Sequence, residues 1–352
     1  MVIFQNLLSN YVFLFLIMGI KDREGGIMGW NTRITEMLGI KYPIIQGAYG
    51  GFGTSAIAAP VSAAGGLGII TAGALHTPEK LREDIKKARD MTDKPIGVNI
   101  SVGMCPQEEE MMGVCIKEGI PVVETAVFRA DHIGKRLKEA GVKWIHKVAT
   151  VQHALAAEQQ GIDAVVIVGL EGTGFKSATQ LTTLTTITWA VRQIKCPVIA
   201  AGGIGDAHGF LAALAMGADA VYMGTAFMAT KECPISERHK QFLVEASPAD
   251  PKVRDSALAP PDPKELEKVM KLRGKIPHSE WLQKLERVLL KQSPDEIPQE
   301  IDTDEVLRIA SGSLAVAVID KIVSVRELID SIISGAEEIL ASGVFPRLKE
   351  RL

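Results

Sequence analysis

The sequence predicts an α/β protein whose main body is a closed (β/α)8 barrel, with a small helical insertion or lid near the C-terminal end. The first observation behind this prediction is a series of eight short apolar runs whose starts recur roughly every 25 residues. The second is that helix-type patterns fill the intervals between the runs. The third is that glycine segments close the last two runs, where such a barrel commonly binds phosphate.

The eight apolar runs are short and rich in β-branched or small residues, as expected for strands buried on both faces. They span residues 42–46, 67–71, 95–100, 121–125, 143–148, 164–168, 197–201 and 218–223. A barrel takes up about 200 residues when it carries few insertions, so the 352-residue chain has further material at its ends.

The predicted helices between these strands begin at recognisable capping residues. Thr77 precedes Pro78, a pair typical of a helix start, and Thr150 and Asp206 precede two further helical patterns. Gly161 is placed to end the helix that follows Thr150. These segments are interpreted as the amphipathic outer ring of the barrel, which packs against the sheet and carries no chemistry of its own.

Composition shifts divide the chain into four segments. Residues 1–27 form an apolar extension, 28–234 the barrel, 235–304 a helical insertion or lid, and 305–352 a last segment whose helix packs back on the barrel. The extension is short for a bilayer span and lacks the flanks of a signal peptide. A membrane-associating segment, a weak signal anchor and a start-site artefact remain open for it, and we expect the artefact.

Charge and composition favour small-molecule chemistry. The formal net charge is -3, and no basic cluster is interleaved with aromatic residues, which argues against a nucleic-acid surface. The four cysteines show no metal-type spacing, so we expect neither a metal site nor a disulfide framework. A cytoplasmic protein without membrane contact is expected, and a homodimer is open.

The glycine segments at the ends of the last two strands predict a phosphate site. Gly202 and Gly203 follow the seventh strand, and Gly224 and Thr225 follow the eighth. Glycine allows a ligand to approach the backbone closely, and backbone N–H groups at such positions bind phosphate oxygens. The alternative is ordinary turn and helix-entry chemistry, but the position after strands seven and eight favours a phosphorylated cofactor.

Polar residues at other strand ends are candidate ligand contacts. Gln46 and Gly47 end the first strand, where an amide and flexible backbone suit a flat heteroaromatic ring. Asn99 lies inside the apolar third strand and needs a partner, which is either a backbone group or a ligand. His146 and Lys147 in the fifth strand must face opposite sides. Lys147 is expected to point into the barrel toward an anion, and His146 toward the helices.

The loop after the sixth strand is the expected location of an acid or base. Gly172 and Gly174 make it glycine-rich, and Glu171 and Lys176 are its ionisable residues. Either of these two charges is alternatively a solvated loop charge.

Five ordered motifs give the chain a family resemblance. It resembles the nitronate monooxygenases, formerly called 2-nitropropane dioxygenases, and the related flavin-dependent enoyl-acyl-carrier-protein reductases. The resemblance covers residues 28–232 and resumes at 311–313. The motifs are Ile-Ile-Gln-Gly at 44–47, Ala-Ala-Gly-Gly-Leu-Gly-Ile-Ile at 63–70, Lys-Pro-Ile-Gly-Val-Asn-Ile at 94–100, Ile-Ala-Ala-Gly-Gly-Ile at 199–204 and Met-Gly-Thr-Ala-Phe at 223–227.

The resemblance implies an FMN-binding TIM barrel. It implies that the FMN phosphate lies at the two glycine segments and that side chains from three strands surround the isoalloxazine ring. The implied cofactor residues are Gln46, Gly47, Asn99, Lys147, Gly172, Gly174, Gly202, Gly203, Gly224 and Thr225.

One residue departs from the family pattern. Members with nitronate or enoyl reductase chemistry carry a histidine in the loop after strand six, and this chain has Phe175 there. A phenyl ring cannot move a proton, so Lys176 and Glu171 become the candidate catalytic groups.

Three functional hypotheses follow. The first is FMN-dependent oxidation of a nitronate or similar carbanion-like substrate through flavin N5, with O2 or another acceptor. The second is NAD(P)H-dependent reduction of a quinone or enoyl thioester. The third is a flavin-binding protein that lacks nitronate activity because of Phe175.

Overall fold

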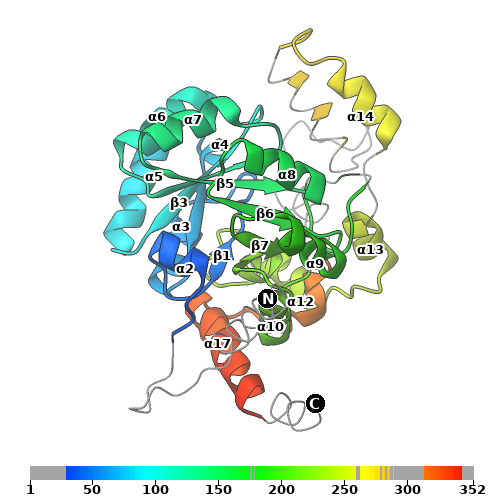
Figure 1. Cartoon of the computed structure of the whole chain (residues 1–352). Coiled ribbons are helices and arrows are strands. Elements are labelled where there is room, and N and C mark those ends of the chain that lie inside the picture. The colour runs from blue at the N-terminus through cyan, green and yellow to red at the C-terminus, as the bar shows by residue number, and fades with distance from the viewer. Residues whose placement is uncertain are drawn as a thin grey trace, which may run out of the picture.

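The computed structural model describes residues 29–174, 177, 179–258, 262–277, 280–281, 284–285, 288 and 313–342. Eight parallel strands form one sheet in the order β1-β8-β7-β6-β5-β4-β3-β2 (Figure 1). Helices alternate with the strands along the chain and surround the sheet. The predicted N-terminal extension, Phe175, Lys176 and most of residues 278–312 lie outside the described residues.

The observed strands lie within two residues of the predicted ones at each end. They are β1 (Ile44–Gln46), β2 (Gly68–Thr71), β3 (Ile96–Ser101), β4 (Val122–Ala126), β5 (Lys143–Val148), β6 (Ala164–Val168), β7 (Val198–Ala201) and β8 (Ala220–Met223).

The barrel closes between β1 and β2 through a few contacts. Ile45 and Leu67 form an isolated parallel bridge. The Gln46 N–H donates to the Leu67 carbonyl at 2.9 Å, and the Leu67 N–H donates to the Ile44 carbonyl at 2.9 Å. The side chain of Gln46 adds a further bond, because its Oε1 accepts from the Ile69 N–H at 2.9 Å. These bonds confirm a nearly closed (β/α)8 barrel.

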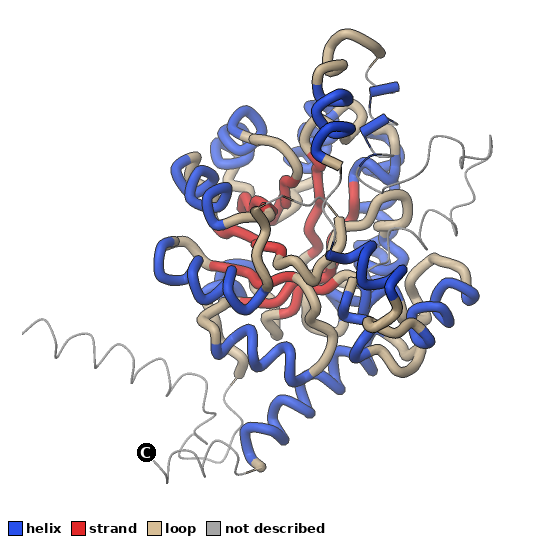
Figure 2. Tube along the Cα trace, turned by 90° about the vertical axis from the view of Figure 1, so that its right-hand side faces the viewer, coloured by secondary structure: helices blue, strands red, loops and turns tan. Residues whose placement is uncertain are grey.

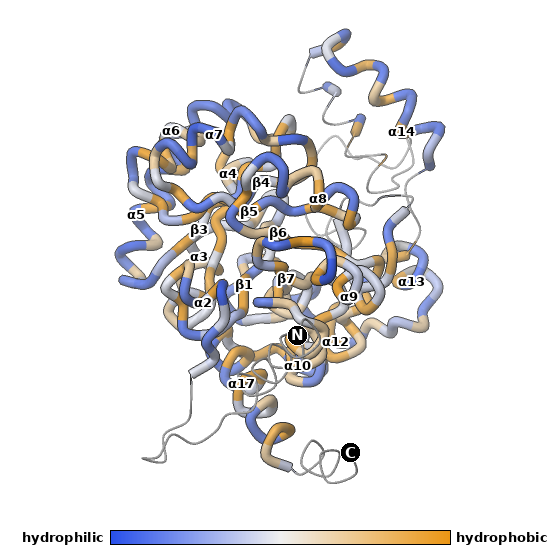
Figure 3. Tube along the Cα trace, in the orientation of Figure 1, coloured by the Kyte–Doolittle hydropathy of each residue, from blue (hydrophilic) through white to orange (hydrophobic). Residues whose placement is uncertain are grey.

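The helices begin where the sequence predicts caps. The hydroxyls of Thr77 and Thr150 and the carboxylate of Asp206 accept hydrogen bonds from backbone N–H groups in the first turns of their helices. The helices of the barrel ring and its base are α2 (Arg33–Leu38), α3 (Ser55–Ala63), α4 (Ala72–Leu75), α5 (Pro78–Met91), α6 (Glu108–Lys117), α7 (Asp131–Glu139), α8 (Val151–Gln159), α9 (Thr183–Gln193), α10 (Ala207–Ala215), α11 (Thr225–Met228) and α17 (Val325–Ala341). Figure 3 shows that outer helices such as α5 and α7 mix hydrophilic and hydrophobic residues.

Strand alternation separates two hydrophobic cores. One fills the barrel interior and includes Ile45, Ile69, Val122, Ile145 and Val166. The other packs the outer face of the strands against the helices. Ile34 and Leu38 of α2 join the inner core and cover the base of the barrel. The carboxyl ends of the strands are therefore the end at which a ligand can enter.

Helix α17 occupies the place of the eighth outer helix. It packs against α10 and α3, and Arg326 donates to the Ala63 carbonyl at 2.9 Å. Between β8 and α17 the chain forms α12 (Glu237–Glu245), α13 (Pro251–Leu258), α14 (Pro263–Met270) and a 3-10 helix, η1 (Leu314–Val318). Figures 1 and 2 show α14 standing away from the barrel body.

The α14 region makes its own small core. Val269, Trp281 and Leu285 are buried there, and Phe128 from the loop after β4 packs against them. The Arg273 guanidinium lies 4.6 Å from the centre of the Phe128 ring. This part of the insertion therefore contacts the barrel at the carboxyl end of β4.

Candidate active site

The two glycine segments form a cradle of backbone N–H groups at the ends of β7 and β8. Gly202 and Gly203 have φ of 108° and 74°, values that side chains rarely adopt. A Cβ at Gly202 would lie 2.9 Å from the Thr183 hydroxyl oxygen. Within the described residues, the N–H groups of Gly203, Gly224 and Thr225 have no acceptor. These donors are available to a ligand.

Glu171 holds the β7 side of this cradle to helix α9. Its Oε2 accepts from the Thr183 N–H at 2.7 Å and from the Thr183 hydroxyl at 2.8 Å. The same hydroxyl oxygen lies 2.9 Å from the Gly202 carbonyl oxygen. The N-cap residue of α9, Thr182, makes no side-chain capping bond, so Glu171 takes over this role from a distant loop. One oxygen of this carboxylate therefore has a structural role, and the catalytic role of Glu171 stays a prediction.

The loop after β1 lies against the β8 side of the cradle. A Cβ at Gly47 would be 3.2 Å from the Gly224 Cα, which shows how closely the two backbones approach. The Tyr49 hydroxyl donates to the Gly224 carbonyl at 2.9 Å. Gln46 directs Nε2 to the Gly47 carbonyl and Oε1 to the β2 backbone, so both ends of its amide already have protein partners.

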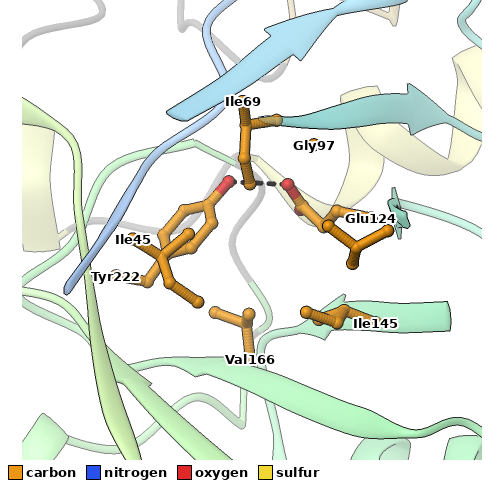
Figure 4. A pocket seen from close by; sticks show the side chains of 8 residues that line it. Ile45, Ile69, Gly97, Glu124, Ile145, Val166 and Tyr222 are labelled. Carbon is orange, nitrogen blue, oxygen red and sulfur yellow. Dashed lines mark hydrogen bonds between the residues drawn. The ribbon is translucent and has the colours of Figure 1, made fainter. Parts of the chain in front are cut away.

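Four polar side chains meet inside the barrel above the inner core. Tyr222 of β8 donates from its hydroxyl to Glu124 Oε2 on β4 at 2.8 Å, across the barrel (Figure 4). The Tyr222 hydroxyl also accepts from the Ala48 N–H at 2.7 Å. Lys147 Nζ lies 3.7 Å from Glu124 Oε1 and 5.1 Å from the centre of the Tyr222 ring. Asn99 on β3 is the register partner of Glu124.

Two atoms in this group have no hydrogen-bond partner among the residues that the structure describes. They are Nδ2 of Asn99 and Oε1 of Glu124, and each side chain is 1% exposed. A buried polar atom left without a partner costs about 1–3 kcal/mol, so such atoms mark ligand sites. Burial, followed by the charge of Glu124, raises the pKa of Tyr222 well above its ordinary value, which keeps the hydroxyl a donor.

The predicted opposite orientation of His146 and Lys147 is confirmed. Lys147 points into the barrel, and its side chain is 23% exposed. His146 packs on the outer side, where its Nδ1 lies 2.7 Å from the Thr125 hydroxyl. That hydroxyl accepts from the Trp144 indole N–H at 2.7 Å. Burial lowers the pKa of His146 to about 4, so it is neutral at pH 7.

The cysteines offer no reactive thiol. All four are free, and burial raises the pKa of Cys105, Cys196 and Cys233 to about 12. It raises the pKa of Cys115 as well. Thiols held protonated at pH 7 are poor nucleophiles. Among the described residues, no cluster of His, Cys, Asp and Glu side chains is suited to hold a metal ion.

The structure brings most of the expected site residues together, and it adds two. Gly172 lies beside the cradle, since a Cβ there would approach the Gly202 Cα to 3.2 Å, and Gly174 has open space and φ of 101°. Glu124 and Tyr222 were not anticipated as site residues. An acidic residue in the apolar stretch Val-Val-Glu-Thr-Ala is a detectable signal for Glu124, of the same kind that identified Asn99.

Comparisons with known proteins show which proteins the chain resembles. The model of the nitronate monooxygenase family matches residues 31–335. A probable nitronate monooxygenase from Staphylococcus saprophyticus is 32% identical over 267 residues, which cover 63% of this chain and 75% of that protein. A 5-hydroxy-7a-methyl-1-oxo-octahydro-1H-indene-4-carboxyl-CoA dehydrogenase from Mycobacterium tuberculosis is 34% identical over 220 residues, covering 62% of this chain and 61% of that protein.

A solved structure extends the similarity over more of the chain. FabK from Thermotoga maritima superposes with a TM-score of 0.70 at 32% identity, and the match covers 92% of this chain and 99% of that one. None of the helices in the described ranges is long and apolar enough to cross a bilayer. The chain therefore belongs to the nitronate monooxygenase family and is an oxidoreductase.

Proposed function

We propose that the protein is an FMN-dependent oxidoreductase that oxidises a nitronate or a similar small carbanion-like substrate. The observation that carries this proposal is the pairing of two unfilled donor sites at one end of the barrel. One is the cradle of N–H groups at Gly203, Gly224 and Thr225. The other consists of the buried amide of Asn99 on β3 and the ammonium of Lys147 on β5, which lie on the two strands that flank Glu124 of β4.

These residues fit a phosphorylated, planar cofactor. The cradle offers several backbone donors to a phosphate, and Gly224 has open space where a Cβ would project, with Tyr49 at 3.8 Å as the nearest neighbour. Asn99 and Lys147 offer donors to ring carbonyls or to the negative charge of a reduced ring. Bound FMN supplies the redox chemistry, accepting electrons at N5 and passing them to O2 or another acceptor.

The protein's part in this chemistry is orientation and electrostatics. Lys147 holds a positive charge at the mouth of the barrel, where it stabilises an anionic ring or substrate. A nitronate is already ionised, so its oxidation needs no base to remove a carbon-bound proton. Phe175 in place of the family histidine is therefore compatible with a nitronate and unfavourable for a neutral nitroalkane.

A second candidate function is reduction of an enoyl thioester or quinone with NAD(P)H as donor. Two relatives favour it: FabK of Thermotoga maritima, which matches almost the whole chain, and a dehydrogenase named for a carboxyl-CoA substrate. Anaerobic stopped-flow bleaching separates the two candidates. Bleaching of the bound flavin by propyl nitronate supports the first, and bleaching by NADH or NADPH alone supports the second.

The cofactor assignment is tested first on the purified protein. We expect the absorption spectrum of an oxidised flavin, and FMN as the flavin released by denaturation. A colourless protein that does not bind added FMN would overturn the proposal.

Gly224→Val tests the phosphate cradle. The valine side chain would enter open space, because only Tyr49 lies within 4 Å of the Cβ position, and φ of -102° suits a side chain. We expect normal thermal unfolding of the apoprotein but at least a tenfold loss of FMN affinity. Gly113→Val, in α6 with no neighbour within 4 Å of its Cβ position, is the matched control and should bind FMN normally. Equal affinity in both variants would exclude the cradle as the phosphate site.

A further inference from the structure

We propose that Glu124 binds the pyrimidine edge of the isoalloxazine ring, as the acceptor between two donors, Asn99 and Lys147. This inference rests on the proposed FMN function and extends it to a residue that neither the sequence motifs nor the family resemblance assigns. It comes from the positions of the three side chains and from a count of their unused hydrogen-bonding atoms.

The three residues come from three consecutive strands. Asn99 is on β3, Glu124 on β4 and Lys147 on β5, and Asn99 and Glu124 are paired in register. Lys147 pairs with Ala126, which lies two residues beyond Glu124 on the same face of β4. All three side chains therefore point into the barrel near its carboxyl end, with Glu124 in the middle.

Each side chain has part of its bonding capacity unused. Asn99 Oδ1 accepts from the Ser101 hydroxyl at 3.1 Å, which leaves its Nδ2 without an acceptor. Glu124 Oε2 accepts from Tyr222, which leaves Oε1 without a hydrogen bond. Lys147 Nζ lies 3.7 Å from Oε1, which is close enough for charge attraction but too long for a hydrogen bond. In the order of the strands, the atoms left open are therefore a donor on Asn99, an acceptor on Glu124 and a donor on Lys147.

Tyr222 fixes which oxygen of Glu124 stays open. Its hydroxyl oxygen accepts from the Ala48 N–H, so its single proton is directed at Glu124 Oε2. The carboxylate is thus held at one oxygen across the barrel, and the other lies 3.7 Å from Lys147 Nζ. An immobilised acceptor loses little entropy when a ligand donates to it.

A ligand that satisfies this pattern needs an acceptor, a donor and an acceptor in a row. The pyrimidine edge of a flavin has this order in O2, N3–H and O4. A phosphate or carboxylate offers acceptors alone and would be repelled by Glu124. A nicotinamide carboxamide offers one acceptor and a donor group, which leaves one of the three open atoms unsatisfied. The order of the open atoms therefore matches the imide edge of a flavin.

The first test compares two flavins on the wild-type apoprotein. N3-methyl-FMN keeps the phosphate and both ring carbonyls but has no N3–H. We expect FMN to bind at least tenfold more tightly than N3-methyl-FMN in a flavin fluorescence titration. In 15N NMR, the N3 resonance of bound [15N]FMN should shift downfield relative to the free cofactor because N3–H donates to a carboxylate.

The second test repeats the titrations with Glu124→Gln. The glutamine oxygen is needed by Tyr222, so its NH2 group faces the ligand and opposes the N3–H donor. FMN affinity should fall at least tenfold, and the preference for FMN over N3-methyl-FMN should fall below about threefold. Asp84→Asn is the matched control, since Asp84 is a buried carboxylate that accepts from Ser55 away from the site. Its FMN affinity should stay within twofold of wild type.

The outcomes separate this inference from the proposed function. Wild-type protein that binds no flavin contradicts the proposed function itself. Wild-type protein that binds FMN and N3-methyl-FMN equally overturns only the role of Glu124, and so does an unchanged preference in Glu124→Gln. If Glu124→Gln fails to fold, the wild-type comparison and the N3 resonance still decide the question.

Discussion

At the residue scale, alternation along a single strand separates a candidate site residue from a structural one. Lys147 enters the barrel, while its neighbour His146 is buried among the outer packing of β5. His146 Nδ1 lies 2.7 Å from the Thr125 hydroxyl, which accepts from the Trp144 indole N–H. Burial favours the neutral imidazole and opposes its protonation.

Because of His146, we expect the free energy of unfolding to fall as the pH is lowered. Its pKa is about 4 in the folded chain against 6.5 ordinarily, so the unfolded chain takes up the proton first as pH falls. Stability contributed by the neutral ring is present above pH 6.5 and is lost between pH 6.5 and 4. We expect a loss of about 2 kcal/mol in the free energy of unfolding between pH 7.5 and 5. Urea unfolding at the two pH values measures it.

His146→Asn should remove this part of the pH dependence, because asparagine can keep a polar partner for Thr125 but does not titrate. His76→Asn, at an exposed histidine, is the matched control and should keep the wild-type slope. An identical pH dependence in wild type and His146→Asn would show that His146 does not titrate as described.

Part of the site was predictable from the sequence because some of its residues are unusual for their position in a strand. Asn99 interrupts an apolar strand, and paired glycines end two strands, so these positions were recognisable without a structure. Glu124 is unusual in the same way, but its partner Tyr222 is 98 residues away on the opposite side of the barrel. An aromatic residue in a strand is ordinary, so only the closed barrel identifies Tyr222 as a hydrogen-bond donor to the site.

The structural contacts of Glu171 were not predictable from the sequence. As an ionisable residue in a glycine-rich loop, it fits the expected pattern of an acid or base. In the structure its carboxylate caps α9 through Thr183. Loop position alone does not distinguish the two roles, because the bond crosses between segments 12 residues apart whose relative geometry the sequence does not determine.

At the element scale, helix α7 depends on one glycine for its close packing on β5. A Cβ at Gly134 would lie 2.2 Å from the Trp144 ring, and this ring is 1% exposed and held by its bond to Thr125. In an exposed helix, replacement of glycine by alanine stabilises by about 1 kcal/mol. At Gly134 we expect the steric conflict with the Trp144 ring to outweigh this stabilisation.

We therefore expect Gly134→Ala to lower the free energy of unfolding by about 1–3 kcal/mol. Gly113→Ala in α6 should raise it by up to about 1 kcal/mol, because no atom lies within 4 Å of its Cβ position. Chemical denaturation of the two variants measures whether the free energy of unfolding changes in opposite directions. Stabilisation by both substitutions would mean that α7 does not approach Trp144 as closely as described.

At the scale of the whole molecule, the barrel was predictable from repetition, and its closure was not. The eight strands were located to within two residues because each is a short buried run bounded by turn or helix signals. The last pairing joins the first two strands of the series, and β1 has three residues. Its register is set by the bridge between Ile45 and Leu67, a pairing that no local sequence pattern encodes.

The placement of α17 is a further property of the whole chain. Helices α12, α13 and α14 separate β8 from the helix that completes the outer ring. A helical pattern predicted α17 as an amphipathic element, but its position between α10 and α3 follows from the remaining gap in the ring. Tertiary packing therefore determines where this helix lies.

The closing seam between β1 and β2 yields the last prediction. Gln46 Oε1 accepts from the Ile69 N–H, and the Gln46 side chain is fully buried. Gln46→Met keeps the side-chain volume and leaves that N–H without an acceptor, at an expected cost of about 1–3 kcal/mol. Hydrogen exchange followed by NMR should show faster exchange of the Ile69 and Leu67 amides, with Val165 and Val198 in the β6–β7 pair as internal references. Uniform acceleration at all four amides would indicate a general loss of stability. Acceleration confined to Ile69 and Leu67 would show that the side chain of Gln46 stabilises the pairing of β1 with β2, which closes the barrel.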